Sequence, residues 1–183
     1  MALIDTENCT LFIIDVQGKL LPAVQSPEQT LSTTLTLVNV AQILDVPIAY
    51  SEHYPQGLGA TEASLLDLIE GKAERFEKQS FSCVSEPSIK TALGQWNRKQ
   101  IIMTGMEAHV CVLQTVLELG EMGFQVFVVV DAVSSRKEYD KSIALQRMQQ
   151  HRVTLVTKEM VLFEWLKRAD HPKFRKISRE FIR

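Results

Sequence analysis

The chain has 183 residues, 45% of them hydrophobic, which fits one globular domain with a full core better than two domains. Its 20 Lys and Arg residues against 22 Asp and Glu residues give a formal charge of −2, so no overall field attracts nucleic acid or an anionic membrane. We therefore expect a single domain over residues 1–183, with neither nucleic acid nor a membrane as partner.

The cysteines and the first residues indicate a compartment. The three cysteines are an odd number without C-x-x-C spacing, which fits neither a secreted disulfide framework nor a zinc knuckle. The N-terminal segment carries acidic residues and no basic region before its first apolar run, unlike a signal peptide. The longest apolar runs, such as 126–130, are far shorter than the ~20 residues that span a bilayer. We expect a protein of the reducing cytoplasm.

Short apolar segments alternate with helical patterns along the chain. The patterns predict buried strands at 11–14, 47–51, 101–104, 126–130 and 153–156, and helices at about 27–45, 109–122, 138–150 and 159–168. Ser26 is the expected N-cap of the first helix. Segment 52–85 is less regular and is predicted as loops with a short helix near 63–69.

Strands that are apolar on both faces and separated by helices predict a parallel sheet covered on both sides. The expected fold is a doubly wound, Rossmann-like α/β domain with three αβα layers. Ligands of such folds bind beyond the carboxyl ends of the strands. The candidate segments are therefore 15–19, 52–59, 105–111 and 131–136.

Asp15 and Cys111 stand at two of these strand ends. A carboxylate at Asp15 is suited to acid–base chemistry, although acids at such positions equally often cap a loop or bind a cation. Cys111 lies where a strand runs into a helix, and a helix N-terminus lowers the pKa of a thiol. A buried cysteine that only fills the core is the more common alternative.

Lys78 is a charged residue in a strand-like stretch between Phe76 and Phe81. A solvated lysine on an edge strand is the ordinary interpretation. Alone, none of these three residues defines a site.

Together, the motifs resemble the isochorismatase-like hydrolase superfamily, which includes nicotinamidases, N-carbamoyl amide hydrolases and isochorismatases. The resemblance extends over nearly the whole chain and is greatest to isochorismatase domain-containing proteins. The matching features are Asp15 with Gln17 after a strand, the central Lys78, Gly105 to Val112 opening a helix around Cys111, VVVDAVSSR at Val128 to Arg136, and SEHYPQGLG at Ser51 to Gly59.

The resemblance implies a catalytic triad of Cys111, Asp15 and Lys78. Cys111 would be the nucleophile, Asp15 would take its proton and later activate water, and Lys78 would balance their charge. It also implies a cis peptide between Met106 and Glu107, with the N–H groups of Glu107 and Cys111 forming an oxyanion hole.

Further assignments concern the substrate pocket. By position, Gln17, His53, Tyr54 and Phe81 are the expected substrate-binding residues. Cys83 is interpreted as structural, because no strand-to-helix junction precedes it. His109 is expected to start the helix or form a wall, since residues two apart do not face each other and a pair with Cys111 is disfavoured.

No metal or other cofactor is predicted. Only Glu52 and His53 are adjacent candidate ligands, and zinc usually takes at least three protein ligands. No phosphate-binding glycine loop is present either. Metal-binding nicotinamidases carry more histidines after the second strand, so nicotinamide is a disfavoured substrate.

Phe174, Ile177 and Phe181 predict an amphipathic C-terminal helix that docks on the domain or on a partner subunit, although basic residues surround it. By resemblance we expect a homo-oligomer, a dimer or tetramer, that acts on a small molecule. The expected reaction is hydrolysis of an amide-type C–N bond through an acyl-enzyme. The alternatives are vinyl-ether hydrolysis, as in isochorismatases, and a catalytically silent scaffold.

Overall fold

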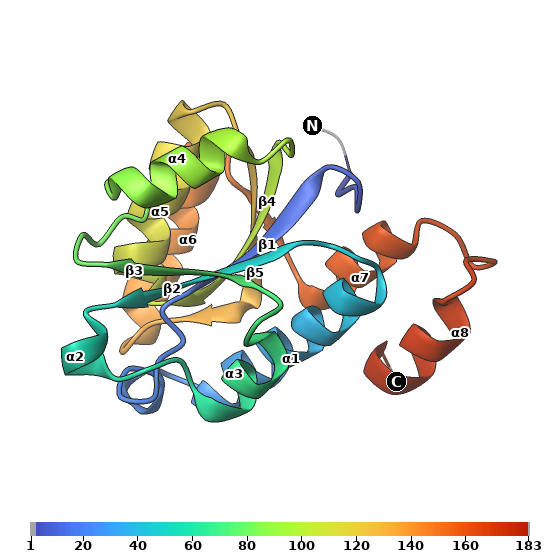
Figure 1. Ribbon diagram of the computed structural model, residues 1–183, viewed down its shortest axis with the longest axis horizontal. Helices are drawn as coiled ribbons and strands as arrows, with labels where there is room; N and C mark the ends of the chain where they lie inside the picture. The colour runs from blue at the N-terminus through green and yellow to red at the C-terminus, as the bar shows by residue number, and fades with distance from the viewer. Residues whose placement is uncertain (1–2, 183) are drawn as a thin grey trace.

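The computed structural model of the chain describes residues 3–182. Their sheet has six parallel strands in the order β3-β2-β1-β4-β5-β6. This order defines a doubly wound Rossmann-like fold and confirms the predicted class (Figure 1). The strands are β1 (Cys9–Ile14), β2 (Ile48–His53), β3 (Glu74–Lys78), β4 (Gln100–Met106), β5 (Gln125–Ser134) and β6 (Thr154–Val156).

Helices cover both faces of the sheet (Figure 1). The first face carries α1 (Pro27–Ile43), α3 (Ala63–Ile69) and α7 (Lys158–Leu166), and the second carries α4 (Pro87–Gln95), α5 (Leu113–Glu121) and α6 (Glu138–Gln150). Shorter segments are α2 (Pro55–Leu58), α8 (Phe174–Ile177), the 3₁₀ turn η1 (Leu21–Ala23) and the π-helical turns η2 (Ala108–Val112) and η3 (Ser178–Ile182).

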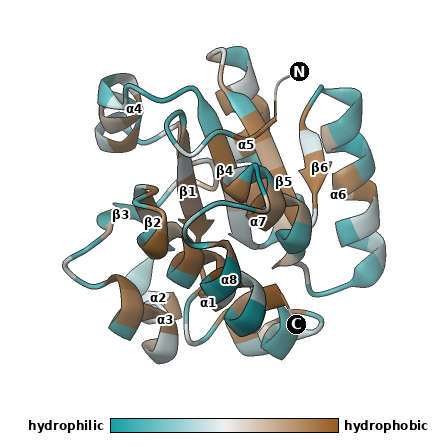
Figure 2. Cartoon of the chain, turned by 90° about the vertical axis from the view of Figure 1, so that its right-hand side faces the viewer, coloured by the Kyte–Doolittle hydropathy of each residue, from teal (hydrophilic) through white to brown (hydrophobic). Residues whose placement is uncertain are grey.

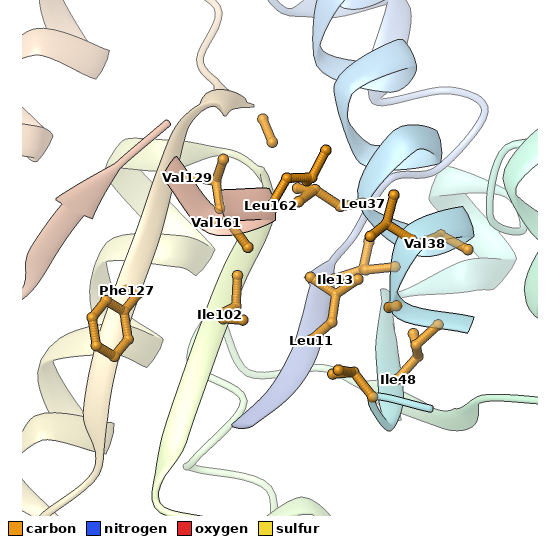
Figure 3. Close-up of a cluster of buried hydrophobic side chains, with 14 of the residues drawn as sticks. Leu11, Ile13, Leu37, Val38, Ile48, Ile102, Phe127, Val129, Val161 and Leu162 are labelled. Atoms are coloured by element: carbon orange, nitrogen blue, oxygen red, sulfur yellow. The ribbon is translucent and has the colours of Figure 1, made fainter. Parts of the chain in front are cut away.

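Successive side chains of β1 point to opposite faces of the sheet, and the core is accordingly divided into two clusters. Leu11 and Ile13 pack with α1 and α7 on one face, as Figure 3 shows. Phe12 and Ile14 belong to the cluster on the other face. All six residues of β1 are buried, because helices cover the sheet on both sides. In Figure 2 the strands are mostly hydrophobic, whereas α6 and α8 carry much of the hydrophilic surface.

Several local predictions were wrong. Segment 52–85, predicted as loops with one short helix, contains the edge strand β3, of which the sequence indicated only a strand-like stretch around Lys78. Ser26 precedes α1, but it has a left-handed backbone and its side chain caps no N–H group. The helix expected from residue 109 begins as the π-helical turn η2, and α5 starts only at Leu113. The helix α4 had not been predicted at all.

The C-terminal segment docks on its own domain. Ile177 is fully buried, and Phe174 and Phe181 pack against the core of the first face. The basic residues Lys173 and Arg175 point to solvent. Within residues 3–182, no helix is both long enough and apolar enough to cross a bilayer.

Candidate active site

Asp15 lies directly beyond β1, at the centre of the sheet. Its side chain is fully buried, and its backbone has a φ of 51°. A left-handed conformation is unusual for a residue other than glycine and is concentrated at functional sites. The Asp15 N–H donates to the carbonyl of Ser51 at 3.1 Å, and the Ser51 hydroxyl donates to Asp15 Oδ1 at 2.6 Å. The carboxylate therefore has a fixed position.

Lys78, at the end of edge strand β3, reaches inward to Asp15. Its side chain is completely buried, and its Nζ lies 2.7 Å from Asp15 Oδ2. The same ammonium donates to the carbonyls of Ser80 at 3.2 Å and Phe81 at 3.1 Å. These contacts match the three donors of a lysine. The interpretation of Lys78 as a solvated lysine is therefore wrong.

The charge of Lys78 depends on its neighbours. Burial acts to lower the pKa of this amine, but the Asp15 carboxylate, together with smaller contributions from Cys111 and Cys83, outweighs it, and the net shift is upward. Lys78 is therefore an ammonium at neutral pH. A buried ion pair is stable only when hydrogen bonds satisfy its remaining groups, as they do here.

Cys111 lies in the π-helical turn η2 and is 5% exposed. Its thiol interacts with both Asp15 and Lys78. Burial and the Asp15 carboxylate raise its pKa to about 12, although Lys78 opposes the shift. The lowered pKa expected from a helix N-terminus is therefore wrong, because the thiol is desolvated, faces an anion and precedes the first residue of α5. The resting group is a neutral thiol beside a potential proton acceptor.

The two other thiols are fully buried. Burial raises the pKa of Cys83 to about 12 and that of Cys9 to about 11. Cys83 also interacts with Asp15 and Lys78, a proximity that the sequence did not reveal. Its N–H donates to Thr115 Oγ1 at 3.0 Å, which fixes it against α5. Of the three cysteines, Cys111 alone has any solvent exposure.

The backbone between β4 and Cys111 follows an unusual course. The peptide bond between Met106 and Glu107 is cis, the geometry that the resemblance implies. Gly105 has a φ of 111°, and a Cβ atom there would lie 2.0 Å from the carbonyl oxygen of Ile14. Only glycine fits this approach. The Glu107 carbonyl accepts the N–H groups of Val110 at 3.0 Å and Val112 at 3.2 Å, which closes the turn that carries Cys111.

A polar network surrounds this turn. Arg136 Nε donates to Glu107 Oε2 at 2.9 Å, and His109 Nδ1 lies 2.9 Å from the Ser135 hydroxyl. His109 therefore connects η2 to the end of β5, consistent with the expected wall position. Sequence reasoning placed Arg136 only in a motif and missed its contact with Glu107.

Gln17 is tied to the loop after β2. Its side chain is fully buried, and its Nε2 donates to the carbonyls of His53 at 3.0 Å and Gly59 at 2.6 Å. Its Oε1 accepts the His53 N–H at 2.8 Å. Because backbone groups occupy both ends of the amide, Gln17 holds the loop after β2, and its predicted contact with substrate stays a prediction.

His53, Tyr54 and Phe81 lie at the same edge of the sheet. The rings of His53 and Phe81 are 5.5 Å apart, and Phe81 is 53% exposed. Tyr54, 49% exposed, covers Gly57 closely, since a Cβ at Gly57 would lie 2.2 Å from the Tyr54 ring. The buried Nδ1 of His53 has no hydrogen-bond partner among the described residues. These residues remain candidates for substrate contacts.

Metal ligands are not grouped in the described part of the chain. Among residues 3–182, no cluster of three or more His, Cys, Asp and Glu side chains is placed to hold a metal ion. Glu52 accepts the Thr61 N–H at 2.7 Å and Arg75 NH2 at 2.6 Å, so its carboxylate stabilises the loop after β2.

Comparisons with known proteins identify one family. The Isochorismatase domain model matches residues 9–160. Isochorismatase domain-containing protein 2 of Rattus norvegicus is 39% identical over 174 residues, 94% of this chain and 80% of the rat protein. The structure named MAR1 ribonuclease from Caenorhabditis elegans has a TM-score of 0.92 at 35% identity and covers 100% of this chain and 93% of that chain.

The structure of YcaC from Pseudomonas aeruginosa, with hexane-2,5-diol and covalent acrylamide, has a TM-score of 0.90 at 24% identity. It covers 96% of this chain and 90% of that chain, and it shows a likeness of fold. The chain belongs to the isochorismatase-like hydrolase family, which confirms the resemblance predicted from its motifs.

Proposed function

We propose that the protein is a cysteine hydrolase that cleaves an amide-type C–N bond in a small molecule. The observation that carries this proposal is the buried pair of Asp15 and Lys78, 2.7 Å apart, near enough to the thiol of Cys111 for both to act on its pKa. A neutral thiol needs a base to become a nucleophile, and Asp15 is the base beside it. Lys78 compensates the negative charge of Asp15 through the ion pair.

The reaction proceeds through two half-reactions. Asp15 takes the thiol proton while the Cys111 sulfur attacks the carbonyl carbon of the substrate. The oxyanion that forms accepts hydrogen bonds from the N–H groups of Glu107 and Cys111. When the C–N bond breaks, the leaving amine takes the proton from Asp15 and an acyl thioester remains on Cys111.

Water completes the cycle. Asp15 accepts a proton from the water, whose oxygen attacks the thioester carbonyl. Collapse of this intermediate releases the carboxylic acid, and the Cys111 sulfur recovers its proton. No protein atom is consumed. Neither half-reaction requires an oxidant or a metal, so treatment with EDTA is expected to leave the rate unchanged.

The direct test is a screen of small amides for released ammonia or amine. A hit is expected to leave a transient acyl adduct on Cys111, detected by mass spectrometry, and Cys111→Ala is expected to lose turnover by at least about 10⁴-fold. Cys83→Ala is the matched control, because its thiol lies near the same ion pair. Full turnover in Cys111→Ala would contradict the proposal.

The released product and the covalent adduct on Cys111 distinguish the proposed amide hydrolysis from its alternatives. Vinyl-ether cleavage would release an alcohol or carbonyl compound and no amine, and a silent scaffold would give neither product nor adduct. The relative from C. elegans is named a ribonuclease, so RNA belongs in the screen. The small amide is favoured because Asp15 and Lys78 are fully buried and Cys111 is only 5% exposed. A cytoplasmic location and a homo-oligomeric state remain predictions.

A further inference from the structure

Ser51 contacts Asp15 with both its backbone and its side chain. The parallel pairing of β1 with β2 places Ser51 opposite Ile14, directly before Asp15. Its carbonyl accepts the Asp15 N–H at 3.1 Å, and its hydroxyl donates to Asp15 Oδ1 at 2.6 Å. Ser51 is 1% exposed, so water does not replace this donor in the folded protein. One residue thus restrains both the main chain and the carboxylate of Asp15.

The two oxygens of the carboxylate have different partners. Oδ1 accepts the Ser51 hydroxyl, whereas Oδ2 faces the Lys78 ammonium at 2.7 Å and has no other donor among the described residues. A hydrogen bond to the ionised form of an acid favours that form. Lys78 contributes a charge as well, but Ser51 contributes only a dipole. Removing the Ser51 hydroxyl therefore leaves the salt bridge to Oδ2 and takes away the hydrogen bond to Oδ1.

The Cys83 thiol is a second polar neighbour of the Ser51 side chain. The Cys83 side chain interacts with Ser51 and Thr115, and the Cys83 N–H is held by Thr115 Oγ1 at 3.0 Å. Cys83 itself is fully buried, so it closes off this side of Ser51 from solvent. This gives Cys83 a packing role beside the site, although it lies close to the ion pair.

We propose that Ser51 is a positioning residue, which holds the Asp15 carboxylate oriented toward the Cys111 thiol. The inference rests on the cysteine-hydrolase function proposed above. Ser51 retains its own proton throughout: the thiol proton moves to Asp15, and the Ser51 hydroxyl remains a donor to Oδ1. Ser51 acts through Asp15, which it contacts with both its backbone and its side chain.

The test uses p-nitrophenyl acetate, which transfers its acetyl group to a nucleophilic thiol and releases p-nitrophenol. The pH dependence of kcat/KM is compared in the native protein, Ser51→Ala and Ser51→Thr, with mass spectrometry locating the acetyl group. Ser51→Ala is expected to lower kcat by about 10- to 100-fold with little change in KM. The acid limb of its rate profile is expected to move toward neutral, because the variant lacks a hydrogen-bond donor to the charged form of the base. Ser51→Thr, which keeps a hydroxyl, is expected to restore both.

Thr34→Val is the matched control for losing a buried hydroxyl. Thr34 is fully buried in α1 and donates to the Thr30 carbonyl at 2.8 Å. It is expected to keep the native pH profile. A native profile and rate in Ser51→Ala would overturn the inference, and so would an equal shift in Thr34→Val. If Ser51→Ala fails to fold, Ser51→Cys, a weaker donor, is expected to shift the profile in the same direction, and a native profile there would overturn it.

The same experiment distinguishes this inference from the proposed function. If the acetyl group is found on Cys111 and Cys111→Ala is inactive, the pH profiles of the Ser51 variants decide the inference alone. If the native protein is not acetylated on Cys111, or if Cys111→Ala retains its rate, the cysteine-hydrolase proposal fails and the role of Ser51 fails with it.

Discussion

The two ends of β1 bury a thiol in different ways. At the amino end, the Cys9 sulfur accepts the Trp165 indole N–H at 3.3 Å, and burial raises the Cys9 pKa to about 11. At the carboxyl end, the Cys111 thiol lies beside Asp15 and Lys78, and its pKa rises to about 12. Both thiols are neutral at pH 7. What distinguishes Cys111 is a proton acceptor in contact with it.

The largest effect expected at the carboxyl end comes from breaking its ion pair. Asp15→Ala leaves the buried Lys78 ammonium without its counter-charge, which is expected to lower the free energy of unfolding by about 3–5 kcal/mol. The double variant Asp15→Ala with Lys78→Met removes both charges and is expected to recover part of that loss. Urea denaturation measures both. A loss below about 1 kcal/mol in Asp15→Ala would show that Lys78 is solvated.

The next effect concerns the glycine beside the site. Gly105→Ala places a methyl group 2.0 Å from the Ile14 carbonyl oxygen at a φ of 111°. The strain is expected to cost about 1–3 kcal/mol and to reduce turnover, because Ile14 directly precedes Asp15. Gly120→Ala is the matched control, since nothing lies within 4 Å of its new Cβ in α5. That change is expected to stabilise the protein by about 0.5–1 kcal/mol. Equal stabilities would contradict the close approach.

Much of the fold could be predicted because the central strands are continuous apolar runs in the sequence. β1 and β4 are buried along their whole length, and apart from Gln100 their residues are apolar or small. Such runs can be recognised in the sequence without knowing which strands pair with them. The edge strand β3 is different. Three of its five residues are exposed and charged, so its sequence resembles a loop until β2 pairs with it.

The residues of the site could be predicted from the sequence, but their pKa shifts and hydrogen-bond partners could not. Positions at strand ends together with the family resemblance singled out Asp15, Lys78 and Cys111, and the structure brings them together. The direction of the Cys111 pKa depends on burial and on an anion from another strand, which no local pattern contains. The role of Gln17 in holding the loop after β2 was missed for the same reason, because its partners lie 36 and 42 residues away.

A smaller effect is expected at the amino end of β1. Cys9→Ala removes the sulfur that contacts Trp165, and we expect a loss of about 1 kcal/mol in the free energy of unfolding. Turnover is expected to stay at the native rate, because Cys9 lies at the opposite end of the strand from Asp15. Denaturation and the amide assay give the two values. A fall in turnover would contradict the assignment of a structural thiol to the amino end of β1 and a catalytic thiol to the carboxyl end.

The smallest effect is a pH dependence at the carboxyl end, carried by His53. Burial, followed by the nearby Lys78 charge, lowers the pKa of His53 below its ordinary value of 6.5, although Asp15 and Glu86 oppose the shift. Because the unfolded chain then binds a proton more readily than the native protein, stability is expected to fall as the pH decreases below 6.5.

The slope from His53 cannot exceed about 1.4 kcal/mol per pH unit, the value for one proton. His53→Gln removes this titration, so the free energy of unfolding of the variant should vary less than that of the native protein between pH 6.5 and 5.5. Urea denaturation at several pH values measures both slopes. Identical slopes would mean that the His53 ring takes up a proton in the native protein as easily as in water. The charge of Lys78 would then be too well screened to reach this side of the pocket.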